Sequence, residues 1–227
     1  MISESKNIVI TGASSGIGYA TALEFAKQGH KVYALARNKD NLAKLQAQAE
    51  LFPGRIVPIV FDLKDFKKDK LEKIFSEVKV IDVLINNAGL LLNKNFLAIK
   101  ESEILEVLQV NYISVIKCVQ FFHSRLMKGI NAHILNISSV GGVTGSVKFP
   151  GLSIYSSSKG ALSILSECLA QDFKEDGIKV NCLALGAVRT EMLSAAFPGF
   201  DPEVTPSEMG IYIAEYAINA QKVVNGV

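Results

Sequence analysis

Apolar runs rich in β-branched residues recur at a regular interval along the first part of the chain. They begin near Ile8, Val32, Ile56 and Val80, about 24 residues apart, and a stretch with helical apolar periodicity separates each run from the next. Continuous apolar runs are typical of strands buried on both faces of a parallel sheet. Parallel neighbours require long crossover connections, which the intervening helices supply. The pattern therefore predicts successive βα units.

The same alternation continues to the end of the chain. Strands are predicted at residues 8–10, 31–36, 55–61, 80–86, 133–138 and 178–185. Helices are predicted at residues 16–28, 38–50, 67–78, 101–128, 154–175 and 207–222, with an irregularity between Val110 and Tyr112 and a loop with short helical pieces at 189–206. The predicted fold class is α/β, a doubly wound parallel sheet with helices on both faces, in one domain spanning residues 1–227.

Polar residues and glycines follow the predicted strands. Ligands of open parallel sheets bind beyond the carboxyl ends of the strands, where the crossover direction switches. Six residues stand at these ends: Gly12, Arg37, Asp62, Asn86, Ser139 and Gly186. We expect them to converge on one crevice.

The first strand leads into a glycine-rich turn and then a helix. Gly12, Gly16 and Gly18 have the spacing G-x-x-x-G-x-G. Glycine allows positive φ and has no Cβ, so a pyrophosphate can approach the backbone N–H groups at the positive end of the helix. The alternative is a glycine-rich turn that binds no ligand.

Tyr155 and Lys159 are four residues apart near the start of a predicted helix, so both side chains can reach one site. An ammonium group nearby favours the phenolate and is expected to lower the tyrosine pKa, which would make Tyr155 a usable general acid or base. Ser139 could donate a hydrogen bond to an oxygen that gains charge. Ser138 is the rival for that role, and an ordinary exposed helix pair is the alternative for Tyr155 and Lys159.

Composition argues against several classes of function. The chain is 49% hydrophobic and 20% charged, with a net charge of +2 and no basic cluster interleaved with aromatic residues, so nucleic acid binding is not expected. No apolar run approaches ~20 residues and no signal-peptide pattern is visible, so we expect a cytoplasmic protein without membrane insertion or secretion.

The cysteines and histidines give no metal-binding pattern. The cysteines are far apart in apolar contexts: Cys118, Cys168 and Cys182. They are interpreted as reduced core residues, with a catalytic thiol as the alternative. The histidines lack metal-ligand spacing, so no metal site is expected: His30, His123 and His133.

Five motifs stand in an order that identifies a family resemblance. They are T-G-A-S-S-G-I-G at residues 11–18, N-N-A-G at residues 86–89, Asn111, Ser139, and Tyr155 followed four residues later by Lys159. Over essentially its whole length the chain resembles the short-chain dehydrogenase/reductase family in its simple single-domain form. The resemblance implies a Rossmann fold and hydride transfer between a nicotinamide and the carbon of a small-molecule carbonyl or alcohol.

The resemblance also implies roles for individual residues. Tyr155 would exchange a proton with the substrate oxygen, and Ser139 would orient and polarise that oxygen. Lys159 would hold the nicotinamide ribose, and Asn111 would hold a water that links Lys159 to solvent. The implied cofactor contacts are Gly12, Ser14, Ser15, Gly16, Ile17, Gly18, Arg37, Asp62, Leu63, Asn86, Asn87, Ala88, Gly89, Tyr155, Lys159, Gly186, Val188 and Thr190.

Cofactor choice depends on the end of the second strand. A carboxylate there would bind the adenosine ribose hydroxyls and repel a 2′-phosphate, but this chain has Ala36 followed by Arg37. A guanidinium suits a phosphate dianion, so NADP(H) is predicted over NAD(H). The alternative is that Arg37 is a solvated loop residue.

The chain departs from the family pattern in three places. Leu185 precedes Gly186 where relatives commonly have proline, and the segment from Ser139 to Tyr155 is a few residues longer than in many relatives. Relatives usually continue into a seventh strand after the position of Val227, so we expect either that this strand lies beyond Val227 or that this edge of the sheet is unfilled. Because that strand commonly supports tetramer contacts, the expected assembly is a homodimer or a homotetramer.

The residues expected around the substrate are apolar: residues 90–92, Val143, Val147, Phe149, Leu193 and Phe197. They favour a hydrophobic or acyl-bearing substrate, such as a 3-oxoacyl thioester. The rival class is a non-catalytic dinucleotide-binding redox sensor or scaffold, which would need the glycine turn but not Asn111, Ser139, Tyr155 and Lys159 together. An epimerase or dehydratase would usually need a larger C-terminal domain.

Overall fold

The computed structural model describes residues 4–227 and contains a six-stranded sheet in which every neighbouring pair is parallel. The strands are β1 (Asn7–Thr11), β2 (Lys31–Ala36), β3 (Arg55–Val60), β4 (Val83–Asn86), β5 (His133–Ser139) and β6 (Lys179–Leu185). Their order across the sheet is β3-β2-β1-β4-β5-β6. The chain therefore reverses its winding direction between β1 and β4, and the carboxyl ends of these two strands form the switch point.

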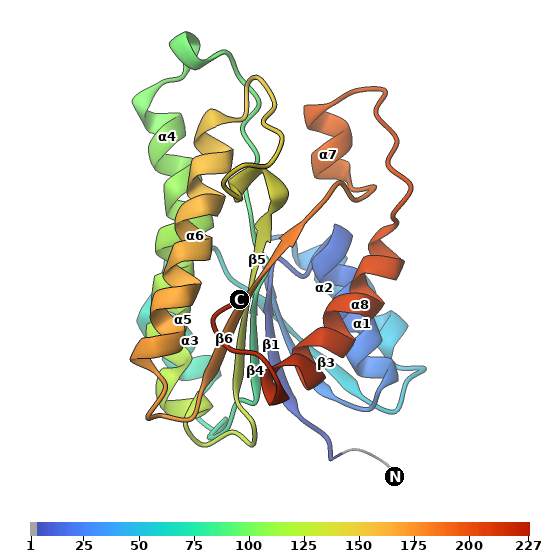
Figure 1. Ribbon diagram of the computed structural model, residues 1–227. Coiled ribbons are helices and arrows are strands. Elements are labelled where there is room, and N and C mark those ends of the chain that lie inside the picture. The colour runs from blue at the N-terminus through green and yellow to red at the C-terminus, as the bar shows by residue number, and fades with distance from the viewer. Residues whose placement is uncertain (1–3) are drawn as a thin grey trace.

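Helices cover both faces of the sheet, which confirms the predicted three-layer architecture (Figure 1). One layer contains α1 (Gly16–Lys27), α2 (Lys39–Ala49) and α8 (Pro206–Asn219). The other contains α3 (Lys68–Ile74), α4 (Glu101–Leu108), α5 (Ser114–Leu126) and α6 (Ser153–Asp172). The short helix α7 (Glu191–Ala196) lies beyond the carboxyl ends of the strands, opposite α4 and α6 (Figure 1).

Alternate residues of each strand enter different cores. Val9 of β1 packs with the aromatic cluster under α3 and α5, whereas Ile8 and Ile10 pack under α1 and α8. All three side chains are fully buried. Burial on both faces is why this strand is a continuous apolar run.

The predicted helix at residues 101–128 is divided into three parts. A π-helical turn, η2 (Gln109–Ile113), separates α4 from α5 and confirms the irregularity predicted between Val110 and Tyr112. By length and composition alone, the stretch Glu101–Leu126 could cross a membrane. Several of its apolar residues belong to the hydrophobic core, because Cys118, Phe121 and Phe122 are buried in the same cluster as Val9 of β1.

The ends of several predicted elements move by a few residues. The strand predicted from residue 80 begins at Val83, and just before it the Ile81 N–H donates to the Arg125 carbonyl near the end of α5, at 3.1 Å, instead of to a strand. Three-residue 3₁₀ turns stand at Phe96–Ala98 (η1), Val140–Gly142 (η3) and Ala220–Lys222 (η4). The last of these replaces the final turn of the helix predicted at residues 207–222.

The last residues of the chain lie beside the outer edge of β6. Gly226 donates its backbone N–H to the Val180 carbonyl at 2.8 Å, and Cys182 donates to the Val227 carbonyl. The Asn225 side chain accepts from the Val180 N–H at 2.9 Å. Part of the edge where a seventh strand is predicted is therefore already hydrogen-bonded.

Candidate active site

The glycine turn after β1 packs tightly against the loop after β4. Gly12 has φ +70°, and a Cβ added there would lie 2.8 Å from the Ala88 Cα. A Cβ on Gly18 would lie 2.4 Å from the side-chain nitrogen of Asn87. That nitrogen donates to the carbonyls of Thr11 and Gly12 at 2.9 and 3.3 Å, so the two loops are bonded to each other at the switch point.

Gly18→Ala should therefore lower the free energy of unfolding by about 1–3 kcal/mol, the range for inserting an extra carbon into a packed site. The added methyl would displace Asn87 from its hydrogen bonds to the glycine turn. Denaturant unfolding measures the change. Gly186→Ala is the matched control, because no described atom lies within 4 Å of its added Cβ. Equal stability of the two variants would contradict the contact.

The cradle fits a dinucleotide. Gly12 and Gly16 both have positive φ, and the Ser15 side chain makes no capping hydrogen bond to α1 within residues 4–227. The first N–H groups of α1 are thus free of a side-chain cap. Thr190 lies across from them, 3.3 Å from the position of a Gly16 Cβ. The turn and the start of α7 therefore border the same space.

Residues predicted to contact the adenosine half of the cofactor lie at the carboxyl ends of β2 and β3. Arg37 is exposed and forms no ion pair or hydrogen bond with any described residue. Asp62 is also exposed, and its carboxylate accepts from the Lys64 N–H at 2.9 Å. Asn86 differs from these, because its side chain is buried and donates to the Asn136 Oδ1 at 2.8 Å.

Tyr155 and Ser139 meet at the carboxyl end of β5. Ser139 ends that strand, Tyr155 lies in the first turn of α6, and the Ser139 side chain lies close enough to the phenol to favour its ionised form. Ser138 points elsewhere: its buried hydroxyl donates to the Lys159 carbonyl at 2.9 Å. Of the two rival serines, Ser139 is the one beside the phenol.

Burial decides the acidity of Tyr155. Loss of solvent raises the pKa of its phenol above the ordinary value, and the nearby Ser139 side chain opposes this only partly. The predicted lowering of the Tyr155 pKa by Lys159 is therefore wrong for the protein without ligand. The Lys159 Nζ is 6.0 Å from the centroid of the Tyr155 ring, too far to outweigh desolvation.

Lys159 is buried beneath the crevice. Only 4% of its surface is exposed, and Nζ donates to the Ile137 carbonyl at 2.8 Å. Burial lowers the pKa of this ammonium from 10.5 to about 8. A Cβ on Gly89 would lie 3.5 Å from the same Nζ, so Lys159 reaches the loop that packs on the glycine turn.

Asn111 sits in the π turn and holds that loop. Its Oδ1 accepts from the Leu90 N–H at 2.7 Å, while its Nδ2 donates to the Leu90 carbonyl at 3.0 Å and to the Ser158 hydroxyl at 2.9 Å. The side chain is fully buried. Asn111 thus fixes the loop backbone beside Lys159, a contact that no sequence pattern indicated.

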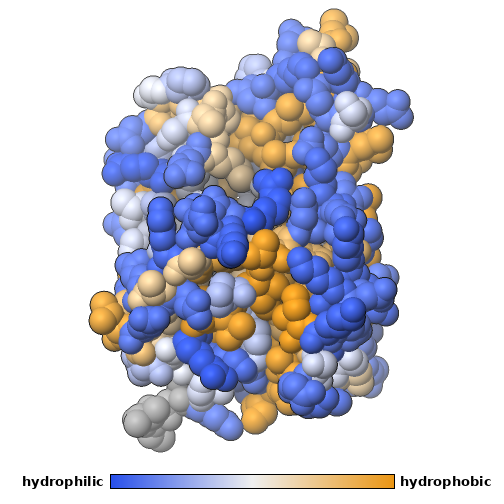
Figure 2. Space-filling view, turned by 180° about the vertical axis from the view of Figure 1, so that it is seen from behind, coloured by the Kyte–Doolittle hydropathy of each residue, from blue (hydrophilic) through white to orange (hydrophobic). Residues whose placement is uncertain are grey.

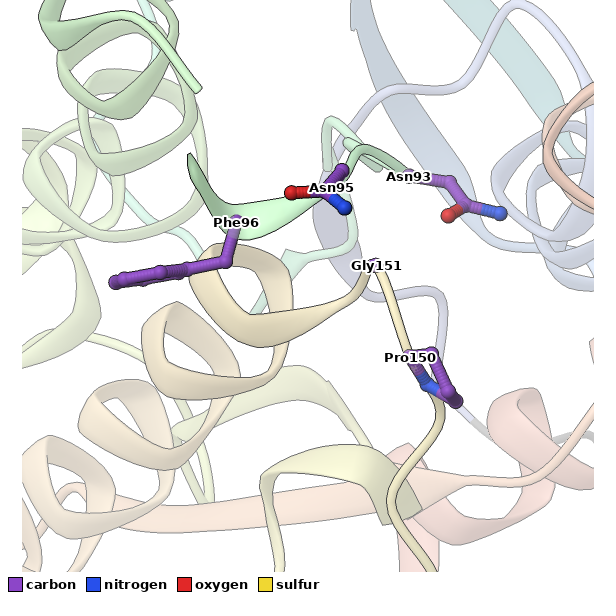
Figure 3. Close-up of a pocket in the computed structure, with 5 residues that line it drawn as sticks. All are labelled: Asn93, Asn95, Phe96, Pro150 and Gly151. Atoms are coloured by element: carbon purple, nitrogen blue, oxygen red, sulfur yellow. The ribbon is translucent and has the colours of Figure 1, made fainter. Parts of the chain in front are cut away.

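Two of the predicted apolar residues contact each other. The rings of Phe149 and Phe197, from different loops, lie edge to face with centroids 6.3 Å apart. Two open hollows of about 520 and 500 Å³ share Phe96, Pro150 and Gly151, and Phe149 also lines the second of them. Figure 3 shows the first, and Figure 2 shows apolar side chains around a hollow at this end of the molecule.

Other reactive side chains lie outside this constellation. Burial raises the pKa of the Cys118 thiol to about 12, which does not suit a nucleophile. Within residues 4–227, no three His, Cys, Asp or Glu side chains are grouped as a metal site would require.

Comparisons with known proteins agree with this geometry. The profile of the short chain dehydrogenase family matches residues 6–199. The 3-oxoacyl-[acyl-carrier-protein] reductase of Thermotoga maritima is 36% identical over 191 residues, which is 83% of this chain and 76% of that protein.

Two solved structures share the whole fold. A protein from Beutenbergia cavernae with bound NADP superposes with a TM-score of 0.89 at 26% identity, covering 99% of this chain and 94% of that one. The 3-ketoacyl-(acyl-carrier-protein) reductase of Brucella melitensis, complexed with NADH, has a TM-score of 0.87 at 25% identity and covers 99% and 95% of the two chains.

Proposed function

Because this chain belongs to the short-chain dehydrogenase/reductase family, we propose that it is an NADP(H)-dependent oxidoreductase acting on a carbonyl or secondary alcohol. The observation that supports this most directly is that Ser139 and Tyr155 lie side by side at the carboxyl end of β5, with Lys159 buried one turn further along α6. A non-catalytic dinucleotide sensor would need the glycine turn but none of these three side chains.

Each of the three side chains has a chemical task. The bound nicotinamide supplies a hydride to the carbonyl carbon. Tyr155 donates its phenolic proton to the carbonyl oxygen, which becomes the hydroxyl of the product. Ser139 donates a hydrogen bond to the same oxygen as negative charge develops on it. Lys159 holds the ribose of the cofactor with its ammonium group.

The protonation state of Tyr155 suits the general-acid role. A phenol whose pKa is raised by burial keeps its proton at neutral pH, as the acid in carbonyl reduction must. Oxidation of an alcohol, the reverse reaction, would use the conjugate base of the same phenol.

The NADP(H) preference is supported by Arg37, whose exposed guanidinium stands at the end of β2 without an ion-pair partner among the described residues. Its fork of N–H groups suits the adenosine 2′-phosphate. The solved relatives bind NADP in one case and NADH in another.

Arg37→Ala should lower kcat/KM for NADPH about tenfold or more and leave kcat/KM for NADH within about twofold, because only NADPH carries the phosphate that Arg37 binds. Initial rates measured at varied NADPH and NADH concentrations give kcat/KM for each cofactor, and hence the NADPH/NADH ratio. Lys39→Ala, which removes an exposed cation two residues away, is the matched control. An unchanged NADPH/NADH ratio in Arg37→Ala would refute the role of Arg37.

A hydrophobic or acyl-bearing carbonyl is the proposed substrate. Phe149 and Phe197 are in apolar contact, and the exposed Val143 and Val147 lie in the loop that joins β5 to α6, the helix of Tyr155. The Thermotoga maritima relative, named for 3-oxoacyl carrier-protein thioesters, supports this class. NADPH oxidation measured against diketones, aldehydes, quinones and 3-oxoacyl thioesters tests the proposed function. No turnover with the whole panel would contradict it.

A further inference from the structure

Three loops that are distant in sequence meet over the substrate side of the crevice. They are the loop after β4 (residues 87–100), the loop between β5 and α6 (residues 140–152) and the segment between β6 and α8 (residues 186–205), which contains α7. Asn93 contacts both of the other loops. Its Nδ2 donates to the Ala196 carbonyl, at the end of α7, at 2.7 Å.

Gly151 forms the second contact of Asn93. Its φ is +85°, and a Cβ added there would lie 2.1 Å from the Asn93 Oδ1 and 3.3 Å from the Lys94 N. The Lys94 N–H also donates to the Gly151 carbonyl at 3.0 Å. Figure 3 shows the loop that carries Asn93, Asn95 and Phe96 running beside Gly151 at the start of α6. Only glycine allows this approach.

The segment between Leu90 and Asn93 is therefore fixed at both ends. Asn111 binds the backbone N–H and carbonyl of Leu90 at one end, beside Lys159. Asn93 binds α7 at the other end. Leu91 and Leu92, which are half-buried, lie between these two anchors. A third link, the packing of Phe149 on Phe197, joins the loop before α6 to the residue after α7.

We propose that Asn93 is a positioning residue for substrate binding, which holds α7 and the loop before α6 together beyond the carboxyl ends of the strands. The inference rests on the proposed function, because it assigns substrate, rather than cofactor, to the space beneath these loops. Asn93 makes one contact with each loop. Its amide nitrogen donates to the Ala196 carbonyl, and its amide oxygen packs against Gly151 where a Cβ would otherwise lie. Neither contact involves the glycine turn, and Asn93 binds α7 at Ala196, the end away from Thr190, which borders that turn. The effect on cofactor binding should therefore be small.

Asn93→Ala should raise KM for the carbonyl substrate about two- to tenfold, the factor that corresponds to loss of one ordinary hydrogen bond. The value of kcat and the NADPH dissociation constant, measured by fluorescence titration, should stay within about twofold. Asn95→Ala is the matched control, because the Asn95 Oδ1 accepts only a local hydrogen bond, from the Leu97 N–H at 3.0 Å. The control should leave all three constants unchanged.

A double-mutant cycle tests the fit above Gly151. Gly151→Ala places a methyl group where the Asn93 oxygen lies, so it should raise KM in the native background. In the Asn93→Ala background the same substitution should raise KM by a smaller factor, because the oxygen is gone. Additive effects would show that the two residues act independently and would overturn the proposed contact.

Limited proteolysis gives a readout that needs no turnover. Cleavage within residues 197–205, an exposed stretch after α7, should be faster in Asn93→Ala than in the native protein and in Asn95→Ala. Unchanged cleavage together with unchanged KM would overturn the role of Asn93 while leaving the oxidoreductase assignment intact. Absence of carbonyl reduction by the native protein would instead count against the proposed function, and the cleavage rates would still test whether Asn93 holds the loops.

Discussion

Tyr155→Phe should lower kcat for carbonyl reduction by about 10²–10⁴-fold, the contribution of a positioned general acid. The substitution removes the phenolic hydroxyl beside Ser139 but keeps the aromatic ring. The dissociation constant of NADPH, from fluorescence titration, should change little because the ring still fills its place beside α6. Single-turnover measurements would show that the chemical step is the slow one.

Tyr19→Phe is the matched control. It removes another phenol hydroxyl, one that donates to the Gln48 Oε1 at 2.9 Å on the exposed side of α1. Its turnover should equal that of the native protein. Turnover of Tyr155→Phe within about twofold of native would remove Tyr155 from the proposed role and, with it, the main support for catalysis.

Lys159→Met should lower kcat/KM for reduction by about 100-fold or more, because the ammonium that holds the cofactor ribose is lost. Methionine is of similar length and apolar, so the buried space stays filled. Unlike Tyr155→Phe, this variant should also bind NADPH more weakly. Lys44→Met, which removes an exposed lysine of α2, is the control for loss of a positive charge.

The same substitution should change how stability depends on pH. Burial lowers the Lys159 pKa from 10.5 to about 8, so between these pH values the unfolded chain holds a proton that the folded chain has released. The free energy of unfolding of the native protein should therefore increase as pH rises from about 8 to about 10.5. Lys159 contributes at most about 3 kcal/mol to this increase. Lys159→Met should lack this gain.

Denaturant unfolding of both proteins at pH 7, 8, 9 and 10 measures the difference. At pH 7 the variant should be at least as stable as the native protein, because it no longer buries an ammonium, although it also loses the hydrogen bond to the Ile137 carbonyl. A stability difference that stays constant across this range would contradict the lowered pKa.

Ser139 and Tyr155, the proposed catalytic pair, illustrate how far sequence reasoning reached. The spacing of Tyr155 and Lys159 predicted one shared site, and the strand pattern placed Ser139 near it; both side chains of the Tyr155–Ser139 pair do meet. The direction of the Tyr155 pKa was predicted wrongly, because the charge on Lys159 was weighed without the loss of solvent around the phenol. Desolvation depends on every atom packed near the group, which a spacing does not contain.

Asn93 and Asn86 illustrate what was missed. Nothing in the sequence near Asn93 distinguishes it from other loop asparagines, since its partners Gly151 and Ala196 are 58 and 103 residues away. The cofactor contact of Asn86 stays a prediction, but the buried bond of its side chain with Asn136 of the neighbouring strand was not foreseen. Both cases depend on which loops and strands become neighbours.

By itself, the sequence determined the order of strands and helices, the glycine turn and the irregularity before α5, because these follow from the local period of apolar residues and from the conformational freedom of glycine. The tertiary structure alone decided which serine meets the phenol, how acidic Tyr155 and Lys159 are, and which side chain joins the loops over the crevice. Those properties arise from burial and from contacts across the fold, and neither exists until the chain has packed.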